Sequence, residues 1–201
     1  MSRPRLNAEE LIDLNHIAFL LIDDDPNSVE IITQELQGFG AWNIARCTSA
    51  ADGREKLIAK EFDFVIVDAH MPAESGYSFV EWLRRSAPSS NRYIPAIIVT
   101  GHSQATEVTR ARDCGAHFVI AKPVVPKVLL DRISWIGREH RMFIETDTYC
   151  GPDRRFKHEG PPPGTKGRRC DDLSPEVGAA AAPNLSQDMI NALLKPSRVK
   201  L

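Results

Sequence analysis

Three consecutive carboxylates, Asp23, Asp24 and Asp25, directly follow the apolar run at residues 17–22. Such a cluster is costly without a counter-charge, because two like charges ~4 Å apart repel by about 4 kcal/mol at an effective dielectric near 20. Asp25 stands just before Pro26, and this pair is typical of a helix N-cap followed by the first helical residue. Asp25 therefore has a structural explanation, whereas Asp23 and Asp24 remain candidates for chemistry.

Polar groups also end three later apolar runs: Asp68 ends VIVD, Thr100 ends IIVT and Lys122 follows VIA. Ligands of open parallel sheets bind outside the carboxyl ends of the strands, so we expect these groups to converge on one edge with the first acids. Mg²⁺ prefers hard oxygen ligands and would offset the repulsion between the carboxylates. An aspartate beside Mg²⁺, an ammonium and a hydroxyl is suited to attack phosphorus as a nucleophile, while the cations neutralise the phosphoryl oxygens.

The elements that must position these groups are five short apolar runs separated by amphipathic segments. The continuous runs FLLI, FVIV and AIIV are typical of strands buried on both faces of a parallel sheet. Strand and helix patterns alternate five times, which predicts a doubly wound α/β domain of about 125 residues. The expected strands are 17–22, 43–47, 64–67, 96–100 and 118–121. Helices are expected between and after them, where apolar residues share one face: Val29/Ile32/Leu36, Phe79/Val80/Leu83, Val108/Ala111 and Val128/Leu129/Ile133/Ile136.

The overall composition is that of an ordinary globular protein, with 201 residues, 42% of them hydrophobic and 26% charged. A formal net charge of −2 gives no global field that favours nucleic acid or membrane. No apolar run approaches the ~18 residues that a membrane span needs, and the N-terminus is too polar for a secretory signal, so we expect a cytoplasmic protein. Its four scattered cysteines are expected to be free thiols: Cys47, Cys114, Cys150 and Cys170.

The chain divides into an N-terminal extension (1–14), the α/β domain (15–140) and a tail (141–201). Residues 151–183 are rich in Pro, Gly and Arg, so we expect this tail to be largely disordered. A short amphipathic helix is expected near 185–194, either binding a partner or packing back on the domain. The arginine doublets 154–155 and 168–169 fit a solvated linker, a dock for an acidic partner, or a site for a small phosphorylated ligand such as a cyclic dinucleotide. The tail has no helix-turn-helix pattern, so we expect no DNA-binding output.

Six pieces of the sequence, in order and at matching spacing, resemble the receiver domain of bacterial two-component response regulators of the chemotaxis-regulator type. The resemblance covers about residues 15–138 and implies the flavodoxin-like strand order 2-1-3-4-5. The matching pieces are LLIDDDP, SAADGREKL, VIVDAHMPAESG, IIVTGHS, CGA and AKP, which begin at residues 20, 49, 65, 97, 114 and 121.

The resemblance implies a role for each group at the expected site. Asp68 would be the phosphoacceptor. Asp23 and Asp24 would hold Mg²⁺, with Asp24 the more direct ligand, and His70 would lend its backbone carbonyl to the metal. Thr100 would bind a phosphoryl oxygen.

Lys122 would pair with the phosphoryl group, and the Lys122–Pro123 peptide would be cis. The phosphodonor would be a sensor histidine kinase or a phosphotransfer protein, and an output protein would bind near residues 103–114 and 118–137. The chain would then be a self-modifying switch and not an enzyme with external turnover.

One position departs from the family pattern. Receivers often carry an aromatic residue three positions before the lysine, and this ring pairs with the hydroxyl residue when the switch operates; here the position is Val119. Phe118 is adjacent, but the two-residue period of a strand points it to the opposite face. The response to phosphorylation is therefore expected to be transmitted differently or more weakly.

Two alternative functions remain open at this point. A phosphohydrolase of the aspartate-nucleophile type usually has a second aspartate two residues after the nucleophile; His70 stands there after Asp68, and Asp25 after Asp23. A degenerate receiver acting as a phosphorylation-independent binding module is favoured only by Val119, because the acceptor set is intact.

Overall fold

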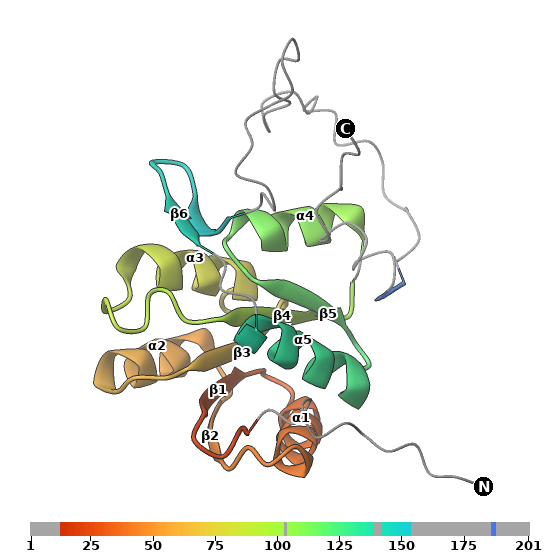
Figure 1. Cartoon of the computed structure of the whole chain (residues 1–201). Helices are drawn as coiled ribbons and strands as arrows, with labels where there is room; N and C mark the ends of the chain where they lie inside the picture. The colour runs from red at the N-terminus through yellow and green to blue at the C-terminus, as the bar shows by residue number, and fades with distance from the viewer. Residues whose placement is uncertain (1–12, 103, 139–141, 154–185, 188–201) are drawn as a thin grey trace, which may run out of the picture.

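The computed structural model describes residues 13–102, 104–138, 142–153 and 186–187 (Figure 1). Across these ranges, the helices are too short and too polar for any of them to cross a membrane.

A five-stranded parallel sheet forms the centre of the molecule. Its strand order is β2-β1-β3-β4-β5, so the predicted doubly wound fold and the predicted order are confirmed. The strands lie within a residue or so of the expected ranges, because continuous apolar runs fit only a sheet covered on both faces. They are β1 (Ala18–Ile22), β2 (Asn43–Cys47), β3 (Phe64–Asp68), β4 (Ala96–Thr100) and β5 (Phe118–Ala121).

Five helices cover the two faces of this sheet (Figure 1). Helices α1 and α5 pack on one face, and α2, α3 and α4 pack on the other. Helices α1, α3, α4 and α5 bury apolar residues of the faces that their sequence period predicts, whereas no such face was predicted for α2. The helices are α1 (Pro26–Gly38), α2 (Ala50–Ala59), α3 (Gly76–Ser86), α4 (Ala105–Asp113) and α5 (Pro126–Arg138).

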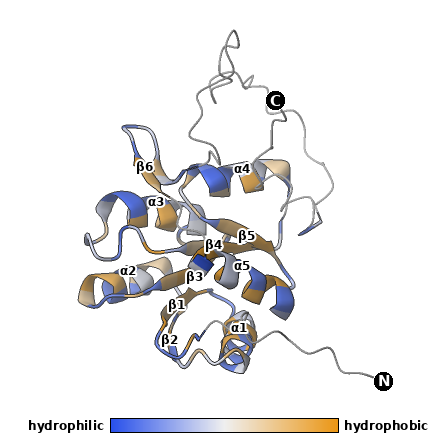
Figure 2. Cartoon of the chain, in the orientation of Figure 1, coloured by the Kyte–Doolittle hydropathy of each residue, from blue (hydrophilic) through white to orange (hydrophobic). Residues whose placement is uncertain are grey.

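The core is concentrated in the central strands, which appear as a hydrophobic layer between half-polar helices in Figure 2. Every residue of β1, β3 and β4 is buried, whereas the edge strand β2 has exposed positions. Fully burying one Leu, Ile or Val side chain contributes roughly 1.5–3 kcal/mol. The strand ends that carry the polar groups are therefore fixed to a rigid layer.

Two of the sequence pieces near the strand ends have local structural roles. Asp25 is the N-cap of α1: its side chain accepts a hydrogen bond from the Asn27 amide at 3.0 Å, and Pro26 opens the helix. Ser49 caps α2 in the same way. A Cβ added to Gly53 would lie 2.5 Å from Ile22 Cδ1, so this glycine lets α2 lie close to β1.

An antiparallel hairpin, β6 (Phe143–Glu145) and β7 (Cys150–Pro152), follows α5 and packs against α3. The hairpin lies within the tail expected at residues 141–201, so the described fold extends past the predicted boundary at residue 140. Cys150 is buried, and a Cβ on Gly115 would lie 2.3 Å from its carbonyl oxygen, so the hairpin and the α4–β5 turn are in backbone contact. Strands of three residues carry too little periodicity to be recognised in the sequence.

Most of the predicted tail lies outside the described residues, including the two arginine doublets, Cys170 and all of the predicted helix at 185–194 except Ser186 and Gln187. The Gln187 carboxamide accepts a hydrogen bond from the Ala121 amide at 2.9 Å and donates one to the Val119 carbonyl at 3.3 Å. This residue thus lies at the free edge of β5. The other three cysteines, Cys47, Cys114 and Cys150, are buried free thiols.

Candidate functional site

The carboxyl ends of three strands bring two acids and an amine into direct contact. Lys122 Nζ lies 2.8 Å from Asp23 Oδ2 and 2.6 Å from Asp68 Oδ1. Asp23 follows β1, Asp68 ends β3 and Lys122 follows β5, so residues separated by up to 99 positions meet at one sheet edge. Asp23 and Asp68 are both buried.

Charge at this edge is only partly balanced. Burial lowers the pKa of Lys122, but hydrogen bonds to Asp23 and Asp68 outweigh burial and raise it, so the side chain is an ammonium at neutral pH. Asp23, Asp24 and Asp68 each have a carboxylate oxygen within 4.8 Å of the others. Three carboxylates against one ammonium leave an excess of negative charge that a divalent cation would neutralise.

The donor set of this cluster fits Mg²⁺. All three ligand candidates are hard carboxylate oxygens, and Asp24 is exposed, so water can complete an octahedral shell. Asp23, Asp24 and Asp68 would hold the ion, which would supply positive charge beside the acceptor carboxylate.

Backbone amides orient the two buried acids. The Asp25 amide donates to Asp23 Oδ1 at 2.9 Å, and the His70 amide donates to Asp68 Oδ2 at 2.7 Å. In each carboxylate one oxygen is thus held by the backbone and the other by Lys122. The metal-binding role expected of the His70 carbonyl stays a prediction; the structure shows its amide holding Asp68.

Gly76 is the last residue of the motif VIVDAHMPAESG, and the structure shows why a glycine stands there. A Cβ at this position would lie 2.1 Å from the Asp68 carbonyl oxygen. The Gly76 amide instead donates to the Ala69 carbonyl at 3.0 Å. The glycine therefore lets the start of α3 pack directly against the end of β3, where the acceptor carboxylate stands.

Thr100 is buried at the end of β4, and its hydroxyl forms two hydrogen bonds with the backbone of His102. It accepts from the His102 amide and donates to the His102 carbonyl, both at 3.0 Å. The Lys122 amide donates to the Thr100 carbonyl at 2.8 Å, so the hydroxyl and the amine extend from adjacent strand ends. The Lys122–Pro123 peptide is cis, as expected.

Val119 is buried in the core on the α3–α4 side of the sheet, and Phe118 is buried on the other side, where its ring lies 5.0 Å from that of Trp135. The predicted opposite orientation of these neighbours is confirmed. Phe118 therefore cannot supply the ring that position 119 lacks.

Sequence reasoning missed two residues beside this site, Tyr77 and Glu107. The Tyr77 hydroxyl donates to Glu107 Oε2 at 2.8 Å, and His70 Nε2 lies 3.4 Å from the same oxygen. Thirty residues separate Tyr77 from Glu107, and no motif or period relates them. Only the fact that Tyr77 follows the motif glycine could have drawn attention to it.

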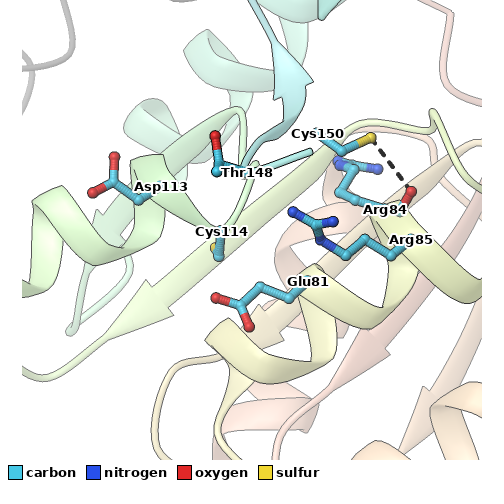
Figure 3. Close-up of a pocket in the computed structure, with 7 residues that line it drawn as sticks. All are labelled: Glu81, Arg84, Arg85, Asp113, Cys114, Thr148 and Cys150. Carbon is cyan, nitrogen blue, oxygen red and sulfur yellow. Dashed lines mark hydrogen bonds between the residues drawn. The ribbon is translucent and has the colours of Figure 1, made fainter. Parts of the chain in front are cut away.

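A second concave region lies at the opposite end of the sheet, between α3, the α4–β5 turn and the hairpin (Figure 3). It has a volume of about 200 Å³. The Cys150 thiol donates to the Arg84 carbonyl at 3.4 Å, the contact dashed in Figure 3. The residues expected at the acceptor site are all absent from its lining, which consists of Glu81, Arg84, Arg85, Asp113, Cys114, Thr148 and Cys150.

Comparison with known proteins points to the same site. The sequence pattern of the response regulator receiver domain matches residues 19–134, more than half of the chain. The transcriptional regulatory protein GltR of Pseudomonas aeruginosa is 31% identical over 126 residues, covering 62% of this chain and 50% of GltR. The chemotaxis protein CheY of the same organism is 26% identical over 117 residues, covering 58% of this chain and 93% of CheY.

The sensory/regulatory protein RpfC of Xanthomonas campestris is 27% identical over 115 residues, but only 16% of RpfC is covered. The chain thus spans half or less of the length of GltR and RpfC. Among solved structures, a CheY-like receiver domain protein of Methanospirillum hungatei aligns with a TM-score of 0.53 at 25% identity, over 59% of this chain and 91% of that one. CheY4 of Vibrio cholerae shares the fold, with a TM-score of 0.55 at 23% identity over 60% of this chain and 98% of its own.

Receiver domains act as phosphoacceptors in two-component signalling, and both the matched segment and the sheet order agree with that class. Through residues 19–134, the chain belongs to the response regulator receiver domain family.

Proposed function

We propose that this chain is a phosphorylation-controlled response regulator whose acceptor is Asp68. The observation that carries the proposal is Lys122, whose ammonium bridges Asp23 at 2.8 Å and Asp68 at 2.6 Å across three strand ends. A sensor histidine kinase or a phosphotransfer protein supplies the phosphoryl group. An oxygen of Asp68 forms the new bond to phosphorus, the bond to the donor's histidine nitrogen breaks, and the product is an acyl phosphate.

Each neighbour has a defined task in this transfer. Lys122 pairs with Asp68 and then with a phosphoryl oxygen, while the Thr100 hydroxyl donates to another. Asp23 and Asp24 hold Mg²⁺ together with Asp68, and the ion, when bound, neutralises charge on the transferring group. The backbone amide of His70 fixes the direction of the acceptor carboxylate.

We place the protein in the cytoplasm, with an output through protein contacts and not through DNA. GltR is a transcriptional regulatory protein, but the match covers half of it, so its output does not transfer to this chain. We also retain the proposal that the arginine doublets bind a small phosphorylated ligand; they lie outside the described residues.

The test is to add acetyl phosphate with Mg²⁺ to the full chain and weigh the intact protein. We expect one phosphoryl group per chain, not formed when the metal is chelated before the donor is added and absent from Asp68→Asn. Asp131→Asn is the matched control, because Asp131 lies on the surface of α5 in an ion pair with Lys127. It should be labelled as fully as the wild type.

Two other outcomes would identify the alternatives. A wild type that binds Mg²⁺ and forms no adduct would be a phosphorylation-independent binding module. Repeated turnover of an aryl phosphate would indicate a phosphohydrolase. The structure offers little for that reaction, since Asp25 is occupied as a helix cap and His70 stands where the second acid would be needed.

A further inference from the structure

An aromatic ring does lie beside the acceptor site, against His70, although it comes from a different element than the family pattern predicts. Tyr77 is the second residue of α3, and its exposed fraction is only 1%. Position 119, the usual source of the ring, holds a valine packed in the core. The ring of Tyr77 is fixed from two sides: the Arg110 guanidinium lies 4.6 Å from its centroid, and the His70 ring meets it edge-on at 6.0 Å.

The Tyr77 hydroxyl connects the acceptor site to α4. It donates to Glu107 Oε2 at 2.8 Å, and the tyrosine ring meets that of His70, whose backbone amide holds Asp68. Burial raises the pKa of Tyr77, the hydrogen bond to Glu107 raises it further, and the Thr100 hydroxyl acts in the opposite direction. The phenol therefore keeps its proton at neutral pH and remains a donor to Glu107.

Glu107 and Arg110 stand three residues apart on α4, so they project from one face of that helix. Both contact Tyr77, one at its hydroxyl and one at its ring face. His70, two residues after the acceptor, also approaches Glu107, at 3.4 Å. A single side chain thus links the start of α3 and, through His70, the loop after β3 to the outer helix α4.

We propose that Tyr77 is the positioning residue that couples occupancy of Asp68 to α4, in place of the ring missing at position 119. The inference rests on the proposed function of Asp68 as acceptor. Thr100 has one hydroxyl proton, which serves one acceptor at a time. When that proton goes to a phosphoryl oxygen, its bond to the His102 carbonyl is lost. The His102 ring lies 5.1 Å from that of His70, which contacts both Tyr77 and Glu107, so the change reaches α4 through Tyr77, Glu107 and Arg110.

The test compares the full chain with Tyr77→Phe, which keeps the ring and removes the hydroxyl. Backbone amide hydrogen exchange of α4 is measured with and without acetyl phosphate and Mg²⁺, with the adduct at Asp68 weighed in the same samples. We expect both proteins to be phosphorylated. The phosphorylation-dependent change in exchange at α4 should be smaller in the variant by on the order of 3- to 10-fold, the value of one hydrogen bond.

Tyr93→Phe is the matched control, because the Tyr93 hydroxyl is exposed and faces Glu145 of the hairpin at 3.4 Å. It should behave like the wild type. Glu107→Ala should reproduce the loss seen in Tyr77→Phe, whereas Glu107→Gln, which keeps an acceptor oxygen, should restore part of the response. The double variant Tyr77→Phe/Glu107→Ala should lose no more than either single variant, because both remove the same link.

The outcomes separate the two proposals. A wild type without an adduct would overturn Asp68 as acceptor. Full phosphorylation of Tyr77→Phe with an undiminished response at α4 would overturn the role of Tyr77 and leave the acceptor intact. If Tyr77→Phe lost its fold, Glu107→Ala, a change on a half-buried helix position, would decide the same question.

Discussion

The two ends of the sheet each bury a charged side chain, but they balance it in different ways. At the carboxyl end, Asp23 and Asp68 share the ammonium of Lys122. At the amino end, Arg84 is equally buried, and its guanidinium donates to two backbone carbonyls, Gly115 O at 3.0 Å and Arg92 O at 2.8 Å. Burial lowers the pKa of Arg84 to about 10, so this side chain is still a cation at neutral pH.

The difference separates a site that can exchange partners from one that cannot. An ammonium held between carboxylates can move to a phosphoryl oxygen, and the carboxylates can bind a cation instead. A guanidinium bonded to main-chain carbonyls has partners that belong to the fold, and the Phe143 ring of the hairpin covers it at 5.1 Å. We therefore expect substitutions at the amino end to change stability and those at the carboxyl end to change chemistry.

The largest effect is expected for Arg84→Met, which leaves the buried Gly115 carbonyl and the part-buried Arg92 carbonyl without the guanidinium donor. Each unsatisfied group costs about 1–3 kcal/mol, so the free energy of unfolding should fall by roughly 3 kcal/mol. Urea unfolding measures this, and the variant should still be phosphorylated below its transition. Arg85→Met is the control, because among the described residues Arg85 donates to the exposed Asp147 carbonyl and to no buried group. An equal loss there would contradict the contrast between the two ends.

Gly115→Ala should have the next largest effect. Gly115 has a φ of +93°, and an added Cβ would lie 2.3 Å from the Cys150 carbonyl oxygen. Forcing a side chain into that conformation costs about 1–3 kcal/mol, and the hairpin must also shift. Gly38→Ala meets nothing within 4 Å and should leave the thermal transition unchanged or raise it. Equal transitions for the two variants would show that the hairpin contact does not stabilise the fold.

Asp25→Ala should reduce stability by about 1 kcal/mol, the usual cost of losing an N-cap. Asp25 caps α1 and is exposed, so the phosphoryl adduct at Asp68 should still form. Thermal unfolding and intact mass on the same sample give both readouts. An adduct that disappears while stability holds would show that the third acid takes part in the chemistry.

The smallest change in stability is expected for Asp24→Asn, within about 0.5 kcal/mol, because the side chain is exposed. Removing one of three neighbouring carboxylates should instead weaken Mg²⁺ binding, seen as a smaller rise of the unfolding temperature when Mg²⁺ is added. Asp13→Asn, an exposed acid outside the cluster, should keep the full Mg²⁺ response. An unchanged response in Asp24→Asn would remove Asp24 from the proposed ligands.

Much of this fold could be predicted because its signals are local. Runs such as FLLI and AIIV identify buried strands, and Asp25-Pro26 identifies a helix start, since each depends on residues close in sequence. The convergence of Asp23, Asp68 and Lys122 could be expected because parallel strands present their carboxyl ends at one edge. The hairpin could not be predicted: Phe143 and Cys150 are held by Arg84 and Gly115, which are distant in sequence.

The sequence by itself determined the alternation of buried strands and helices and the residues that end each strand, because these follow from the apolar period along the chain. The strand order was implied by the resemblance of six sequence pieces to receiver domains, not by the period. The tertiary structure alone decided which side chains meet across elements. In the folded chain, Tyr77 donates a hydrogen bond to Glu107, and Arg84 is buried beneath the Phe143 ring of the hairpin. Such contacts depend on distances between elements that no local pattern encodes, so the link from acceptor site to outer helix became visible only in the folded chain.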